Sequence, residues 1–185
     1  HIKVESMTSE EIRRLRLCNV DLTETFLPLN TFEEVLEHLK NKCILNLDRS
    51  IKILDDVMKI VNKHNMADQV LLKSDPSDAS LKMVETFAPK VDYMPIFMEE
   101  DVASEKIENM NINYIGAELV FKSESSSIAQ DSYIDMMHKK GRILWGNSIV
   151  YSSRVPLAAG HNDDISLTGD PEDGWGWLAK KGFDI

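Results

Sequence analysis

Short apolar runs alternate with amphipathic helical stretches along most of this chain. Parallel strands need long crossover connections, which are usually helices, so this alternation predicts an α/β fold with a parallel sheet. The expected strands are 43–48, 69–73, 91–97, 114–121 and 142–145, with another beginning at 182–185, and the expected helices between them are 50–64, 77–88, 103–109, 127–139 and 174–181.

Two capping boxes mark helix starts in the first forty residues. Thr8 is followed by Glu11, and Thr31 by Glu34, and in each case an apolar periodicity comes next. A threonine and a glutamate three residues apart satisfy each other's free backbone N–H groups, which favours helix initiation. We therefore expect helices after Thr8 and Thr31, with a loop over 21–28 between them.

An open doubly wound sheet and a closed eight-stranded barrel both contain such units. The chain has no glycine-rich phosphate loop, which is the main sign of a nucleotide-binding open sheet. Six strands are countable, and the first helix comes before any strand. We therefore predict a TIM (β/α)8 barrel that is incomplete and lacks roughly its first two strands. No linker rich in Pro, Gly or Ser divides the chain, so residues 1–185 are expected to form a single, partial barrel domain.

Composition narrows the function classes. The chain has 185 residues, 43% of them hydrophobic, which is enough for an ordinary core without disulfides. Its formal charge of −10 is opposite in sign to that of proteins that bind nucleic acid or anionic membranes. No run of 18 apolar residues exists, so no transmembrane segment is expected.

The two cysteines, Cys18 and Cys43, fit neither a disulfide framework nor a zinc spacing. We expect Cys43 to be buried in a strand and Cys18 to be half-buried in a loop. The compartment stays open between the cytoplasm and a periplasmic or secreted location, and so does the oligomeric state.

Polar side chains lie near the carboxyl ends of four expected strands, where a barrel gathers its catalytic and binding residues. Asp48 and Lys73 end two strands, Glu118 interrupts an apolar run, and Trp145 and Asn147 share one face of another strand. Together they predict a site for a metal and an anion. Asp48 is the candidate ligand for a hard divalent cation, and Lys73 is the candidate phosphate contact.

Each of these residues also has an ordinary structural interpretation. Asp48 can cap the next helix, Lys73 can be a solvated lysine, Glu118 can belong to a structural ion pair and Trp145 can pack in the core. Among the five histidines only His161 lies in a loop beside acids, and we assign it no catalytic part.

The order of these motifs resembles that of the glycerophosphodiester phosphodiesterase family. The segments that carry the resemblance are Leu-Pro-Leu-Asn-Thr-Phe-Glu-Glu-Val-Leu at 27–36, Ile-Leu-Asn-Leu-Asp at 44–48, Val-Leu-Leu-Lys-Ser at 70–74, Gly-Arg-Ile-Leu-Trp-Gly-Asn at 141–147 and Gly-Trp-Gly-Trp-Leu-Ala-Lys-Lys-Gly-Phe-Asp-Ile at 174–185. The resemblance implies a phosphoric diester hydrolase of glycerol and lipid metabolism. Such an enzyme cleaves glycerophosphodiesters to glycerol 3-phosphate and an alcohol with a calcium or magnesium ion and two acid/base histidines.

By this resemblance Asp48 matches the family's acidic metal ligand, Lys73 a residue near the substrate phosphate and Trp145 the aromatic wall of the pocket. We also assign Glu118 and Asn147 to the substrate site, although the family's Asn falls one place later, where this chain has Ser148. The chain departs from the family at Ser50, where a Lys is usual. The family's His-Arg-Gly, Glu-x-Asp and His-Asp segments would all precede residue 1. We therefore expect no catalytic residue in this chain, and no activity from it alone.

Two rival functions remain. A degenerate barrel could bind a phosphoryl or polyol ligand without turnover, which Ser50 favours. An unrelated barrel, such as a sugar isomerase or aldolase, would use Lys73 in Schiff-base chemistry if the amine were desolvated.

Overall fold

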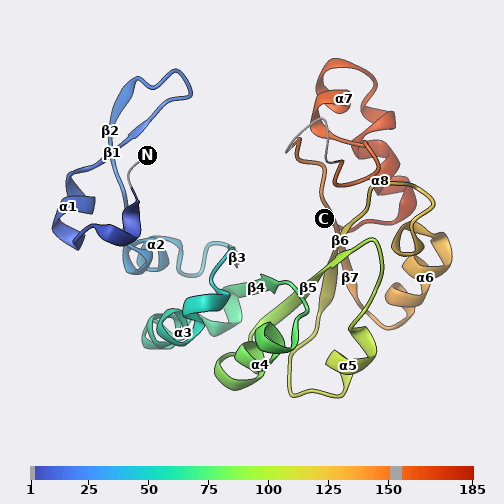
Figure 1. The fold of residues 1–185 in the computed structure, drawn as a ribbon, viewed down its shortest axis with the longest axis horizontal. Coiled ribbons are helices and arrows are strands. Elements are labelled where there is room, and N and C mark those ends of the chain that lie inside the picture. The colour runs from blue at the N-terminus through green and yellow to red at the C-terminus, as the bar shows by residue number, and fades with distance from the viewer. Residues whose placement is uncertain (1–2, 151–155) are drawn as a thin grey trace. The chain divides into compact units, whose positions relative to one another are not determined.

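A computed structural model describes residues 3–150 and 156–185 of the protein. The chain divides into two compact units, His1–Cys43 and Ile44–Ile185, which are described separately (Figure 1).

The first unit contains two short helices and a hairpin. Helix α1 spans Ser9–Arg14 and helix α2 spans Phe32–Leu39, after a 3-10 turn at Val4–Ser6. Both predicted capping boxes are confirmed, because the side chains of Thr8 and Thr31 accept from the backbone three residues on, and each glutamate accepts in return.

The loop predicted over 21–28 is wrong. Strand β2, Glu24–Pro28, pairs antiparallel with β1, Arg16–Cys18. The hairpin buries neither face, and Phe26 is 99% exposed. Without a buried face the strands need no alternation of apolar and polar residues, so periodicity could not reveal them.

The second unit is the predicted alternation of strands and helices. Its strands are β3 (Leu45–Leu47), β4 (Val70–Ser74), β5 (Asp92–Met98), β6 (Gly116–Val120) and β7 (Ile143–Gly146), and its helices are α3 (Leu54–Lys63), α4 (Asp78–Phe87), α5 (Ser104–Glu108), α6 (Asp131–Lys139), α7 (Asp163–Thr168) and α8 (Trp175–Lys181). Short 3-10 turns stand at Ile51–Ile53, Ala67–Gln69, Ser127–Ala129 and Pro171–Asp173.

The five strands that the structure describes in the second unit are parallel and lie in chain order, β3-β4-β5-β6-β7. The predicted α/β fold with a parallel sheet is therefore confirmed. The last residues extend the row, since Gly146 donates its N–H to the Ile185 carbonyl and Asp184 donates its own to the Leu144 carbonyl. Figure 1 shows α3, α4, α5 and α6 following one another along the curved row of strands.

The two faces of the sheet differ in chemistry. One face carries Leu72, Tyr93, Phe97, Leu119 and Leu144, all at most 2% exposed, and forms the core. Side chains alternate along a strand, so the neighbouring residues Lys73, Met94, Glu118 and Trp145 stand on the opposite face.

Two further expectations are wrong. Cys43 and Cys18 are both exposed, and Cys43 precedes a strand of only three residues instead of being buried within one. Helix α7 lies outside the expected helices and begins with Asp163 and Asp164 in its first turn. Its apolar residues Ile165 and Leu167 are exposed, so the segment carries no amphipathic pattern.

Candidate functional site

Lys73, Glu118 and Trp145 meet on one face of the sheet. The Lys73 Nζ lies 2.7 Å from the Glu118 Oε2 and 3.6 Å from the centroid of the Trp145 ring. The ammonium group therefore makes a charge-assisted hydrogen bond to the Glu118 carboxylate and a cation–π contact with the Trp145 ring.

Asn147 completes this group, which we call the rim cluster: Lys73, Glu118, Trp145 and Asn147. The Asn147 Nδ2 donates to the Glu118 Oε1 at 2.9 Å, so each carboxylate oxygen of Glu118 has its own partner. The Asn147 Oδ1 in turn accepts from the Ile149 N–H at 3.3 Å. Asn147 thus orients Glu118 more than it presents itself to a ligand.

Strand register explains why these distant residues meet. Glu118 pairs with Trp145 on one side and with Ile96 on the other, while Lys73 pairs with Met94. Strand β5 therefore separates Lys73 from Glu118, and the four-carbon lysine stem crosses it. These positions share one face because paired residues of parallel strands point to the same side, and Met94 and Ile96 are two residues apart on β5.

The ion pair of the rim cluster is nearly sealed from solvent, with the Lys73 and Glu118 side chains each 7% exposed. Charges at this depth are weakly screened, so their interaction is much stronger than at a surface. The Lys73 ammonium carries three N–H groups, and Glu118 and the Trp145 ring use only part of that capacity. The Lys73 ammonium group therefore has the capacity to donate to an additional oxygen acceptor.

Asp48 does not join this cluster in the described part of the chain. It directly follows β3, its side chain is 67% exposed, and its charged partner is Arg49 at 3.6 Å. Arg49 has a φ of +53°, so the chain turns away from the strand direction at this point. Ser50 is buried, and its hydroxyl donates to the Leu47 carbonyl.

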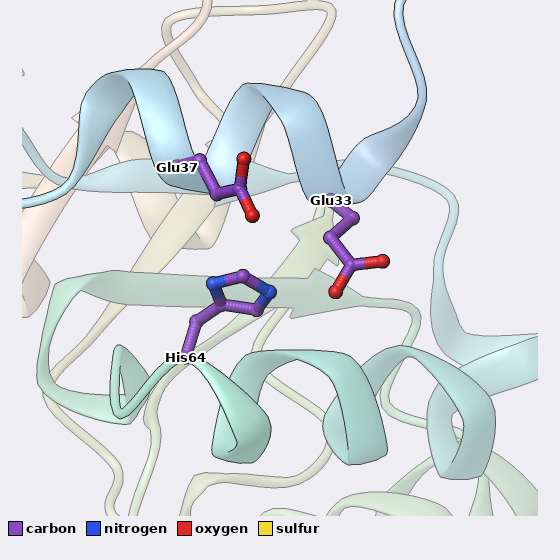
Figure 2. A group of neighbouring side chains, drawn as sticks. All are labelled: Glu33, Glu37 and His64. Atoms are coloured by element: carbon purple, nitrogen blue, oxygen red, sulfur yellow. The ribbon is translucent and has the colours of Figure 1, made fainter.

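Asp48 alone does not make a metal site. Divalent cations of the calcium and magnesium type need several oxygen ligands, whereas the described surroundings of Asp48 supply a cation as its partner. Figure 2 draws another acidic group, with Glu33 and Glu37 on α2 and His64 after α3. These residues belong to different units, whose relative positions are not determined, so no site is assigned to them.

A second polar network, which the sequence did not reveal, lies on the helix-covered face. The hydroxyls of Ser74 and Tyr93 lie 3.0 Å apart, and burial raises the pKa of Tyr93 to about 12. Asp75 accepts from Ser77 and Ser80 at the start of α4, and those bonds lower the pKa of its carboxyl group. These bonds fix the connection between β4 and α4, which begins shortly after Lys73 in the chain.

A groove of about 640 Å³ lies between α5 and α6 and includes Asp101 in its lining. Asp101 accepts from the backbone N–H groups of Ala103 and Ser104 and from the Tyr133 hydroxyl. Burial and the Asp101 charge both raise the pKa of Tyr133. We interpret this network as a helix cap, because Asp101 accepts from backbone N–H groups at the start of α5.

The second half of the chain matches a known family model. Residues 93–185, slightly more than half of the chain, match DUF4996, a domain of unknown function. The chain belongs to the DUF4996 family. The DUF4996 region contains β5, β6 and β7 and hence three rim-cluster residues, Glu118, Trp145 and Asn147, while Lys73 comes before it.

No curated protein matches the chain. Within residues 3–150 and 156–185, none of the helices combines the length and apolar character needed to cross a membrane.

Proposed function

We propose that this chain is the carboxyl-terminal part of a (β/α)8 barrel that hydrolyses glycerophosphodiesters to glycerol 3-phosphate and an alcohol. The observation that carries the proposal is the rim cluster, in which residues from β4 and β6 and from β7 and the residue after it share one buried site. The resemblance to glycerophosphodiester phosphodiesterases supplies the reaction.

The strand order supports the barrel part of the proposal. A doubly wound open sheet reverses its strand order at a switch point, whereas a barrel adds each strand beside the one before it. Strands β3 to β7 follow the second pattern, and Asp184 and Ile185 bond to β7 as a following strand would. In a barrel the rim cluster would lie on the inner face, toward the carboxyl ends of the strands.

The chemistry of the rim cluster suits a phosphodiester with a polyol group. Lys73 offers N–H donors to a phosphate oxygen, and Trp145 offers an aromatic wall to the carbon skeleton. Glu118, held by Asn147, offers carboxylate acceptors to hydroxyl groups. The low exposure of the pair keeps these interactions strong.

The divalent ion in this proposal, calcium or magnesium, comes from the resemblance. The described residues around Asp48 do not form its site by themselves, so further ligands would come from segments preceding His1. The same holds for proton transfer, because no described histidine contacts the rim cluster. We therefore expect hydrolysis only from a longer protein that carries those segments.

The test is an assay of such a longer protein on glycerophosphocholine with calcium or magnesium, measuring glycerol 3-phosphate. We expect the double variant Lys73→Met with Glu118→Gln to lose at least 100-fold in kcat/KM, about 2.7 kcal/mol of transition-state stabilisation. The matched control Lys139→Met removes an exposed lysine on α6 and should retain full activity. Absence of product from the unaltered protein would refute the reaction, and release unaffected by Asp48→Ala would show that Asp48 is not the metal ligand.

A non-catalytic barrel that binds a phosphoryl or polyol ligand is the second candidate. The exposure of Asp48 and the Ser50 position favour it, since the cluster is then a binding site without a metal beside it. Saturable binding of glycerol 3-phosphate by a longer protein that releases no product would establish this function over the first.

A further inference from the structure

His161 makes two hydrogen bonds that a neutral imidazole cannot make together. Its Nδ1 lies 2.5 Å from the backbone carbonyl oxygen of Asp173, and its Nε2 lies 3.0 Å from the Glu124 Oε1. A carbonyl oxygen and an ionised carboxylate only accept, so both ring nitrogens must donate. Only the imidazolium form of histidine carries two N–H groups.

The surroundings of His161 favour that charged form. Its ring stacks on Trp177 with centroids 3.9 Å apart and planes 6° apart, and an indole face attracts a cation. The His161 side chain is 15% exposed, and that of Glu124 is 61% exposed. Lys181 lies 5.6 Å from the same indole, and its own partner is Asp131 at 2.6 Å.

The contacts of His161 join four segments of the second unit. Glu124 lies in the loop after β6, Asp173 ends the 3-10 turn Pro171–Asp173, and Trp177 belongs to α8. The His161 backbone N–H donates to Ala158, and Phe121 bonds to the carbonyl of Leu157 and the N–H of Ala159. Trp177 also contacts Phe121, three residues after Glu118.

We propose that His161 is a proton-dependent latch that fastens the segment carrying α7 to the end of β6 and to α8. Loss of the proton leaves one ring nitrogen with a lone pair facing an acceptor oxygen, so one bond breaks and the segment loosens. The latch therefore requires the doubly protonated ring that its two acceptor oxygens demand, and it opens when the ring gives up a proton. The inference does not depend on the proposed function.

The direct test is NMR of the ring nitrogens in the ¹⁵N-labelled 185-residue chain at pH 7, where a free histidine is mostly neutral. We expect both His161 nitrogens to carry protons, and the exposed His38 ring serves as the internal comparison. A His161 ring with one bare nitrogen at pH 7 would overturn the latch.

Thermal unfolding of variants provides the second measurement. Glu124→Gln can turn its amide NH₂ toward a neutral ring, so it should keep the latch closed without the extra proton. Between pH 7 and pH 9 the Tm of the unaltered chain should fall by about 3 °C more than that of Glu124→Gln or His161→Gln. The control His38→Gln should keep the full pH dependence. Equal pH profiles in all four proteins would contradict the proposal.

Discussion

Two charged pairs involve residues in or directly after strands of the same sheet, and they differ in burial. Lys73 and Glu118 are 2.7 Å apart and almost sealed from solvent, while Asp48 and Arg49 are 3.6 Å apart and mostly exposed. An exposed pair contributes about 0–1 kcal/mol to stability, whereas removal of one partner from a buried pair leaves an uncompensated charge. The location of a carboxylate at a strand end therefore says little until its burial is known.

The largest expected effect comes from breaking the buried pair. Lys73→Met leaves the Glu118 carboxylate buried without its cation and should lower the free energy of unfolding by about 3–5 kcal/mol. Adding Glu118→Gln removes that charge and should recover more than half of the loss. Urea unfolding of the single and double variants measures both values, and a single-variant loss below about 1 kcal/mol would show that the pair is not buried in solution.

The next effect concerns the residue that orients Glu118. Asn147→Ala removes the donor to the Glu118 Oε1 and should cost about 1.5–3 kcal/mol, the usual contribution of a hydrogen bond to a charged group. Urea unfolding checks this value. In the Glu118→Gln background the same change should cost about half as much, and equal costs in both backgrounds would mean that the carboxylate charge is not involved.

A smaller effect is expected on the opposite face of β4 and β5. Tyr93→Phe removes the bond to Ser74 and should cost about 1 kcal/mol at pH 7. Burial raises the pKa of Tyr93 to about 12, above that of an unfolded tyrosine near 10, so the folded state keeps the proton longer. Stability should therefore fall between about pH 10 and 12, and less steeply in Tyr93→Phe than in the unaltered chain. Equal slopes in denaturant titrations across that range would contradict the assignment.

The smallest effect is expected at the exposed pair. Asp48→Asn should change the unfolding free energy of this chain by no more than about 0.5 kcal/mol, because solvent already screens its interaction with Arg49. A loss above about 1.5 kcal/mol in urea unfolding would mean that Asp48 has a buried partner.

The sequence predicted the second unit better than the first because the second unit has a core. Residues such as Leu72, Phe97 and Leu144 must be buried, so their spacing records the strands. The hairpin β1–β2 has no buried face, so its sequence shows no apolar alternation from which the strands could be predicted. The expected burial of Cys43 was wrong because β3 is a short strand at the edge of the sheet.

Four of the five candidate site residues form one cluster, and the fifth does not. Within each strand, side chains alternate between the two faces, so local sequence can indicate that Lys73, Glu118 and Trp145 each oppose the apolar face of their strand. The specific partners depend on register across β5 and on the reach of the lysine stem, which are tertiary properties. The Asp48 turn depends on the positive φ of Arg49, which no residue preference predicts.

We propose that the rim cluster binds a phosphorylated polyol. The most direct test is titration of the 185-residue chain with glycerol 3-phosphate while NMR follows the Trp145 indole N–H signal. The variant Trp145→Phe assigns that signal. We expect a saturable shift at Trp145 that Lys73→Met with Glu118→Gln abolishes and Lys139→Met preserves. No shift at Trp145, or an equal shift in the double variant, would contradict the claim.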